Sequence, residues 1–270
     1  MAVLPNATRP ADDQVTGDDH RPAVILEGVT RMFRERGDHD EKIAIDNVSL
    51  TVPVGQTVAI TGPTGSGKST LLDLIAGIER PDAGTVIVGG VPVASLSSRR
   101  AAGFRRRIGF VSGDAELVTT LTVLDNVVFP LLLERTGAWR RRVDRHRRAS
   151  ELLDAVGLGR VATARVGQLA AVHRRQVAVA RAMVTRPALV LADEPTNGLD
   201  RDSAARVLDD LLRLIRQQGG TLVLATRDDS IAVRCRRVIA LQDGSFLADH
   251  VDDTRPKAVR RWIDRPAPLL

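Results

Sequence analysis

The apolar residues of this chain fall into short runs with two different spacings. Residues 188–194 (ALVLADE) and 221–226 (TLVLAT) are nearly continuous in apolar residues, which is typical of buried strands. Residues 68–78 (KSTLLDLIAGI) instead carry leucine and isoleucine at helical spacing. The pattern predicts an α/β fold with buried parallel strands. The other predicted elements are strands at 23–30 and 48–62, hairpin-like segments at 84–93 and 238–246, and helices at 174–187 and 203–220.

The ends of the chain differ in composition from its centre. Residues 1–22 are polar and acidic and carry two prolines, so we expect a disordered N-terminal lead. Residues 23–249 are expected to form one domain, with a helical, very basic part at about 113–165 and a polar tail at 250–270. No internal repeat and no second copy of the nucleotide motif described below is visible.

Composition narrows the class of protein. The chain has 270 residues and is 43% apolar but only 3% aromatic, so its core must consist of Val, Leu, Ile and Ala. The single Cys235 rules out an internal disulfide and fits a reducing compartment. No apolar run is long enough to span a bilayer, and four aspartates stand where a secretory signal would need basic and then apolar residues. We therefore expect a cytoplasmic protein.

The net charge of +6 raises nucleic acid as a partner. Arginine, however, supplies 36 of the 39 basic residues, which is typical of a GC-rich bacterial genome. A basic surface also suits the anionic inner leaflet of a membrane. No nucleic-acid partner is expected.

The strongest chemical motif is Gly62-Pro63-Thr64-Gly65-Ser66-Gly67-Lys68-Ser69, here called the phosphate loop. It follows a predicted strand and opens a predicted helix, which is the context that this motif requires. Its glycines let several N–H groups face one point, and the helix N-terminus adds partial positive charge. Lys68 would reach the outer phosphates of ATP, the Ser69 hydroxyl would bind Mg²⁺, and Thr70 completes the predicted binding segment.

A second motif lies at the end of residues 188–194. Asp193 ends a predicted buried strand, where its carboxylate can hold Mg²⁺ through water. Glu194 is placed to orient or deprotonate the attacking water. Buried strands often end in acidic residues, so Asp193 and Glu194 alone are weak evidence of a nucleotide site. Together with the phosphate loop they become strong evidence.

With these residues in place, the chain resembles the ATP-binding subunits of ABC transporters, in the lipoprotein- and macrolide-exporter group. The similarity covers residues 24–245 and includes RRRIGFV, TLTVLDNVVFPLLLER and VARAMVTRPALVLADEPTNGLD. It implies a P-loop NTPase core with an antiparallel β subdomain and an inserted α-helical subdomain. It also implies head-to-tail dimers with ATP between the subunits, a membrane permease as partner, a peripheral location on the inner face of the plasma membrane, and Phe33 stacked on adenine.

The chain departs from the family pattern at three places. The signature Leu-Ser-Gly-Gly-Gln aligns with residues 169–173 (LAAVH), the Q-loop glutamine with Gly113, and the switch histidine with Arg227. Losing one preorganised donor at a reacting centre costs about 10²–10³ in rate, so we expect weak hydrolysis by the chain alone. Arg227 could compensate by offering a cation to the γ-phosphate.

Several functions stay open at this stage. The chain could power a transporter, as a dimer with itself or, as we favour, with a more complete ABC ATPase. It could instead be a non-hydrolysing regulatory subunit or a cell-division-type ABC ATPase. Soluble ABC proteins of translation or DNA repair are disfavoured, because a second cassette, long coiled coil or zinc site is not visible.

Overall fold

The structure is a computed structural model that describes residues 22–34, 41–113, 116–133 and 141–251. The predicted N-terminal lead, apart from Pro22, and the predicted tail beyond Val251 lie outside the described residues. The elements, in chain order, are β1 (Val24–Arg34), β2 (Glu41–Val52), β3 (Thr57–Thr61), α1 (Lys68–Ile75), β4 (Ala83–Val88), β5 (Val91–Pro92), α2 (Ser98–Arg105), β6 (Ile108–Ser112), α3 (Val123–Leu133), α4 (Arg142–Ala155), α5 (Ala171–Met183), β7 (Leu189–Asp193), α6 (Arg201–Gln218), β8 (Thr221–Thr226), α7 (Asp229–Ala232), β9 (Arg237–Gln242) and β10 (Ser245–Val251).

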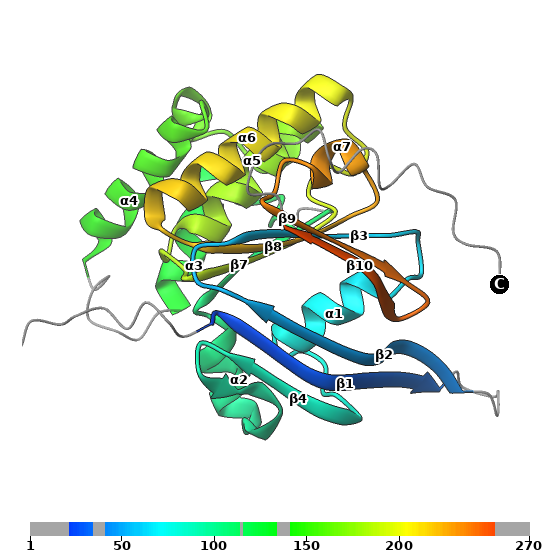
Figure 1. The fold of residues 1–270 in the computed structure, drawn as a ribbon. Helices are drawn as coiled ribbons and strands as arrows, with labels where there is room; N and C mark the ends of the chain where they lie inside the picture. The colour runs from blue at the N-terminus through cyan, green and yellow to red at the C-terminus, as the bar shows by residue number, and fades with distance from the viewer. Residues whose placement is uncertain (1–21, 35–40, 114–115, 134–140, 252–270) are drawn as a thin grey trace, which may run out of the picture.

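A six-stranded sheet in the order β10-β9-β3-β8-β7-β6 forms the centre of the molecule (Figure 1). Its strands are parallel except for β10, which pairs with β9 in antiparallel fashion at one edge. All residues of β3 and β8 are buried, which explains their continuous apolar sequences. The strands β3, β8 and β7 are parallel neighbours. The segments that follow them in the chain therefore meet at the carboxyl ends of these strands.

A second sheet, in the order β2-β1-β4-β5, is antiparallel. Helix α1 lies between the two sheets (Figure 1). Its buried residues Leu71, Leu72, Leu74 and Ile75 share one hydrophobic core with β1, β2, β4 and the facing strands of the central sheet. This packing holds the start of α1 against β3.

Helices α3, α4, α5 and α6 build the other hydrophobic core. Buried residues of these helices pack together and against β3, β7 and β8, and α5 and α6 cover the face of the central sheet opposite α1 (Figure 1). Helix α6 is capped by Gly219, which has a left-handed φ of 66°, and the glycine cap predicted from the sequence is confirmed. Among the described residues, no helix is both long and apolar enough to cross a membrane.

The structure corrects one predicted element and confirms others. Residues 48–62 were expected to form one strand, but they contain the end of β2, a turn at Val54-Gly55, and β3. Pro53 cannot donate a ladder hydrogen bond and Gly55 adopts a φ of 76°, so the chain reverses there. The two hairpins are confirmed as β4–β5 and β9–β10, the latter with left-handed Asp243 and Gly244 in its turn.

Candidate functional site

The phosphate loop joins the end of β3 to the start of α1. Gly67 precedes α1 with a left-handed φ of 103°, and a Cβ there would lie 2.2 Å from the backbone oxygen of Ala44. Only glycine meets both requirements without displacing the neighbouring strand. The described part of α1 shows no capping side chain and no acidic residue in its first turn, so its first amides stay available to an anion.

Lys68 opens α1 and is only 7% exposed. Its Nζ donates hydrogen bonds to the backbone oxygens of Gly62 and Pro63, each at 2.8 Å. Burial lowers the pKa of Lys68, the negative charges of Glu194 and Asp193 raise it, and Arg227 lowers it. The loop therefore wraps around a nearly buried cation that faces two carboxylates.

Asp193 ends the strand β7, which lies between β8 and the edge strand β6, and Glu194 follows it directly. Asp193 pairs with Ser112 of β6 and Ala225 of β8. Its Oδ1 is buried and accepts no hydrogen bond from any described residue. Glu194 has a left-handed φ of 45°, and its Oε2 accepts a hydrogen bond from Thr226 Oγ1 at 3.3 Å.

A cleft of about 420 Å³ lies above the phosphate loop. It brings together most of the predicted site, but Gly62, Pro63, Ser66 and Asp193 are not among its lining residues. Ser66 is buried, and its Oγ has no hydrogen-bond partner among the described residues. The residues lining the cleft are Phe33, Lys42, Ala44, Thr64, Gly65, Gly67, Lys68, Ser69, Thr70, Glu194, Asn197 and Arg227.

The sequence did not single out Lys42, Ala44 or Asn197. Lys42 reaches the cleft because β2 pairs it with Phe33 of β1, a register that only the folded sheet reveals. Its one local signal was the rarity of lysine in this chain. A larger hollow of about 750 Å³ beside α6 and α7 contains none of the predicted residues, so size alone does not locate the site.

Arg227 follows β8 and lines the cleft together with Lys68. Its Nη2 donates a hydrogen bond to Asn197 Oδ1 at 2.8 Å. The backbone oxygen of Asn197 accepts another from Arg175 Nη2 of α5, at 3.1 Å. Asn197 thus connects the edge of the cleft to the first turns of α5.

Gly113 follows β6 and lies against the acidic pair. A Cβ at this position would come within 2.9 Å of the backbone oxygen of Glu194. Any side chain at residue 113 would therefore push on the backbone that carries Glu194.

Residues 169–173 lead into α5. Ala170 precedes the helix and offers no side-chain oxygen to its first amides, whereas Leu169 and Val172 pack against the core that the helices form. Arg174 Nη1 donates to the backbone oxygen of Leu169 at 2.7 Å, so this cation folds back onto its own segment.

Comparisons with known proteins agree with this geometry. The family model for the ABC transporter matches residues 45–197. The chain is 40% identical over 233 residues to the lipoprotein-releasing system ATP-binding protein LolD of Bordetella pertussis, which covers 86% of this chain and 98% of that protein. It is 38% identical over 230 residues to an uncharacterized ABC transporter ATP-binding protein of Mycobacterium tuberculosis, covering 85% of this chain and 90% of the relative.

Solved structures show the same architecture. A bacterial ABC transporter cassette solved as a dimer superposes with a TM-score of 0.78 at 33% identity, covering 84% of this chain and 98% of that one. The same values hold for a dimeric post-hydrolysis state of that cassette bound to ADP and Pi. The P-loop NTPase fold is thus shared along nearly the whole length of these solved structures. The chain belongs to the family of ABC transporter ATP-binding subunits, in the group of the lipoprotein-releasing proteins.

Proposed function

We propose that this chain binds MgATP above its phosphate loop at the interface of a dimer, and that this binding powers or regulates a membrane permease. The observation that carries the proposal is the nearly buried Lys68, held by loop carbonyls at the start of an uncapped helix. A phosphate group would replace the carbonyls as the partner of this cation and accept from the free amides.

The residues present fit both nucleotide and metal. Asp193 Oδ1 is buried without a hydrogen-bond partner among the described residues, as expected of a group that holds a metal-bound water. Ser69 lines the cleft at the start of α1, where its hydroxyl would be a metal ligand. When bound, Mg²⁺ supplies positive charge to the phosphate oxygens. Exposed Phe33 at the edge of the cleft would stack on the adenine.

Glu194 would orient or deprotonate the attacking water. It lines the cleft close to Lys68, and its carboxylate is held by the Thr226 hydroxyl. The left-handed backbone of Glu194 and the close approach of Gly113 to its backbone oxygen would help to hold this residue in place for that role.

Hydrolysis by the chain alone is proposed to be weak. Gly113 offers no side-chain amide beside Glu194, and Arg227 stands in place of the switch histidine. Arg227 would offer a fixed cation to the γ-phosphate, because its guanidinium already lies at the cleft with Asn197 as its partner. Ala170 would offer no hydroxyl to a partner subunit's nucleotide.

The partner of this chain would be a second ABC ATPase with a more complete signature, although a homodimer would use the same surfaces. A relative of this chain is named as part of a lipoprotein-releasing system, and a similar cassette was solved as a dimer. These findings support a permease partner and a location on the inner face of the membrane. A non-hydrolysing regulatory subunit and a cell-division-type ATPase remain the alternatives.

The test separates nucleotide binding from turnover. The purified chain is titrated with MgATP by calorimetry, and phosphate release is followed beside the Bordetella pertussis relative under the same conditions. We expect saturable binding with turnover about 10²-fold or more below the relative. Equal turnover would contradict weak hydrolysis, and turnover no higher than that of Glu194→Gln would favour the regulatory alternative. Co-purification from the native membrane then identifies the permease and any second ATPase.

A further inference from the structure

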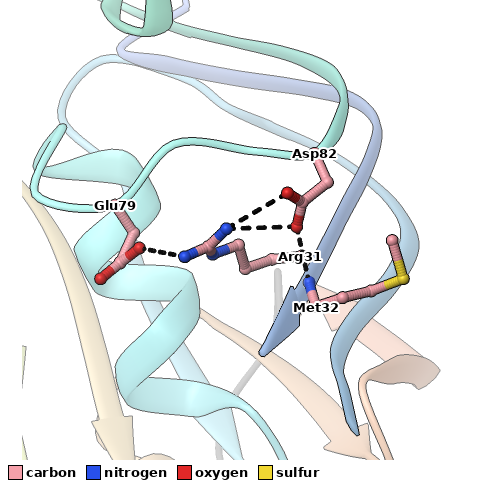
Figure 2. Close-up of polar contacts among 4 residues, drawn as sticks. All are labelled: Arg31, Met32, Glu79 and Asp82. Carbon is pink, nitrogen blue, oxygen red and sulfur yellow. Dashed lines mark hydrogen bonds and ion pairs between the residues drawn. The ribbon is translucent and has the colours of Figure 1, made fainter. Parts of the chain in front are cut away.

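Arg31 belongs to none of the motifs found in the sequence, yet it is held by two carboxylates. Its Nη2 donates to Glu79 Oε2 at 2.6 Å, and its Nη1 donates to Asp82 Oδ1 at 3.2 Å (Figure 2). The Arg31 side chain is 21% exposed, so these pairs are partly shielded from water. Both carboxylates follow α1 in the chain, whereas Arg31 lies on β1.

The backbone on both sides of Arg31 is fixed by the same acid. Asp82 Oδ2 accepts a hydrogen bond from the amide of Met32 at 2.7 Å (Figure 2). The amide of Asp82 donates to the backbone oxygen of Thr30 at 2.8 Å. The register between β1 and β2 shifts on each side of Arg31, so the sheet ladder alone does not hold this stretch. The hydrogen bonds from Asp82 hold the backbone of β1 in this stretch.

Glu79 connects this cluster to the helix that begins at the phosphate loop. The amides of Ile78 and Glu79 donate to the backbone oxygen of Asp73 in α1, at 2.9 and 3.2 Å. A continuous path of hydrogen bonds thus runs from α1 through Glu79 to the guanidinium of Arg31.

The guanidinium of Arg31 also lies over the ring of Phe33, with its Cζ 4.5 Å from the ring centroid. This is the range of a cation–π contact. Phe33 lines the cleft, whereas Arg31 is not among the lining residues. Phe33 itself is 36% exposed among the described residues, so Arg31 does not bury the ring.

We propose that Arg31 is a positioning residue for the base of the bound nucleotide, acting through Phe33. It keeps the aromatic ring at a set place relative to α1 and therefore to the phosphate loop, so that a purine whose phosphates occupy the loop meets the ring. The two carboxylates neutralise the guanidinium, so Arg31 adds little attraction for the phosphates themselves. This inference rests on the proposed function, because it needs a nucleotide in the cleft.

The test compares a ligand that has a base with one that lacks it. The full chain and Arg31→Gln are titrated with MgATP and with magnesium tripolyphosphate, which offers phosphates but no purine. Arg31→Gln is expected to raise the Kd for ATP by about 3- to 10-fold and to leave that for tripolyphosphate unchanged. Arg80→Gln, an exposed arginine on the same turn whose Nη2 donates to Leu96 O, is the matched control and should change neither.

A double-mutant cycle separates positioning from other roles. In a Phe33→Leu background, Arg31→Gln should have no further effect on ATP binding. An undiminished effect in that background, or equal weakening for ATP and tripolyphosphate, would overturn the proposal. If Arg31→Gln fails to fold, Glu79→Gln is tested in its place. A higher Kd for ATP with an unchanged Kd for tripolyphosphate supports the positioning role. An unchanged Kd for ATP refutes it. Failure of the unmodified chain to bind either ligand would instead refute the proposed function.

Discussion

Helices α1 and α6 both begin with a basic residue, but their first turns are built in different ways. Gly67 leads into α1 with a left-handed backbone and no capping side chain. Asp200 leads into α6, and its Oδ1 accepts hydrogen bonds from the amides of Asp202 at 3.1 Å and Ser203 at 2.9 Å. In the described part of the chain, no side chain caps the first amides of α1, whereas Asp200 satisfies two of the first amides of α6.

This difference shows what turns a helix N-terminus into a ligand site. A carboxylate already bonded to the first amides removes the capacity for an external anion and compensates the helix dipole. Helix α1 keeps that capacity and adds the charge of Lys68, at the cost of an uncompensated terminus. A residue without a capping side chain, such as Gly67, therefore favours phosphate binding at the start of the helix. A capping residue such as Asp200 instead stabilises the helix.

Removing the basic residue that begins each helix should produce the largest difference between the two termini. Lys68→Ala should weaken MgATP binding by on the order of 100-fold, because charged hydrogen bonds to the phosphates are lost. Arg201→Ala, the matched change at the first residue of α6, should leave the affinity unchanged. Calorimetric titration of both variants checks this, and comparable losses in the two would contradict the distinction.

A smaller effect is expected from filling the glycine before α1. Gly67→Ala should lower the free energy of unfolding by about 1–3 kcal/mol from backbone strain alone. The overlap with Ala44 O adds to this loss. Gly65→Ala is the control in the same loop, since its φ is 84° but no atom lies within 4 Å of the added Cβ. Urea unfolding should rank Gly67→Ala as clearly less stable than Gly65→Ala, and the reverse order would show that crowding against β2 is unimportant.

The smallest effect concerns the cap of α6. Hydrogen bonds from the Ser203 amide lower the pKa of Asp200, so its stabilisation is complete above the ordinary aspartate pKa and is lost as pH falls through the lower folded-state pKa. Asp200→Ala should reduce the thermal midpoint by a few degrees near neutral pH. Its melting curve should converge with that of the unmodified chain in acid.

Asp200→Asn provides the control for this last prediction. Asparagine caps helices about as well as aspartate but does not titrate. The Asn variant should therefore stay near the unmodified midpoint at neutral pH. A deficit as large as that of Asp200→Ala would mean that charge, and not hydrogen bonding, makes the cap effective.

How far the site could be predicted from sequence depended on how local each part is. The phosphate loop and the Asp193-Glu194 pair are short segments at the ends of buried strands, and the structure places Lys68 facing both acids. Predicted Phe33 is far from the loop in sequence, yet it lines the same cleft. Lys42 and Asn197 were missed, because a strand register brings one to the cleft and a turn after β7 brings the other.

Sequence alone determined the family, the α/β class and the residues of the phosphate loop, because these rest on residue types at fixed local spacing. Three contacts follow from tertiary packing: Gly113 lies against the backbone of Glu194, Asn197 joins Arg175 to Arg227, and Arg31 connects the turn after α1 to Phe33. Each of these contacts joins residues on different elements. Their distance is set by how sheets and helices pack, and no spacing along the chain encodes that directly.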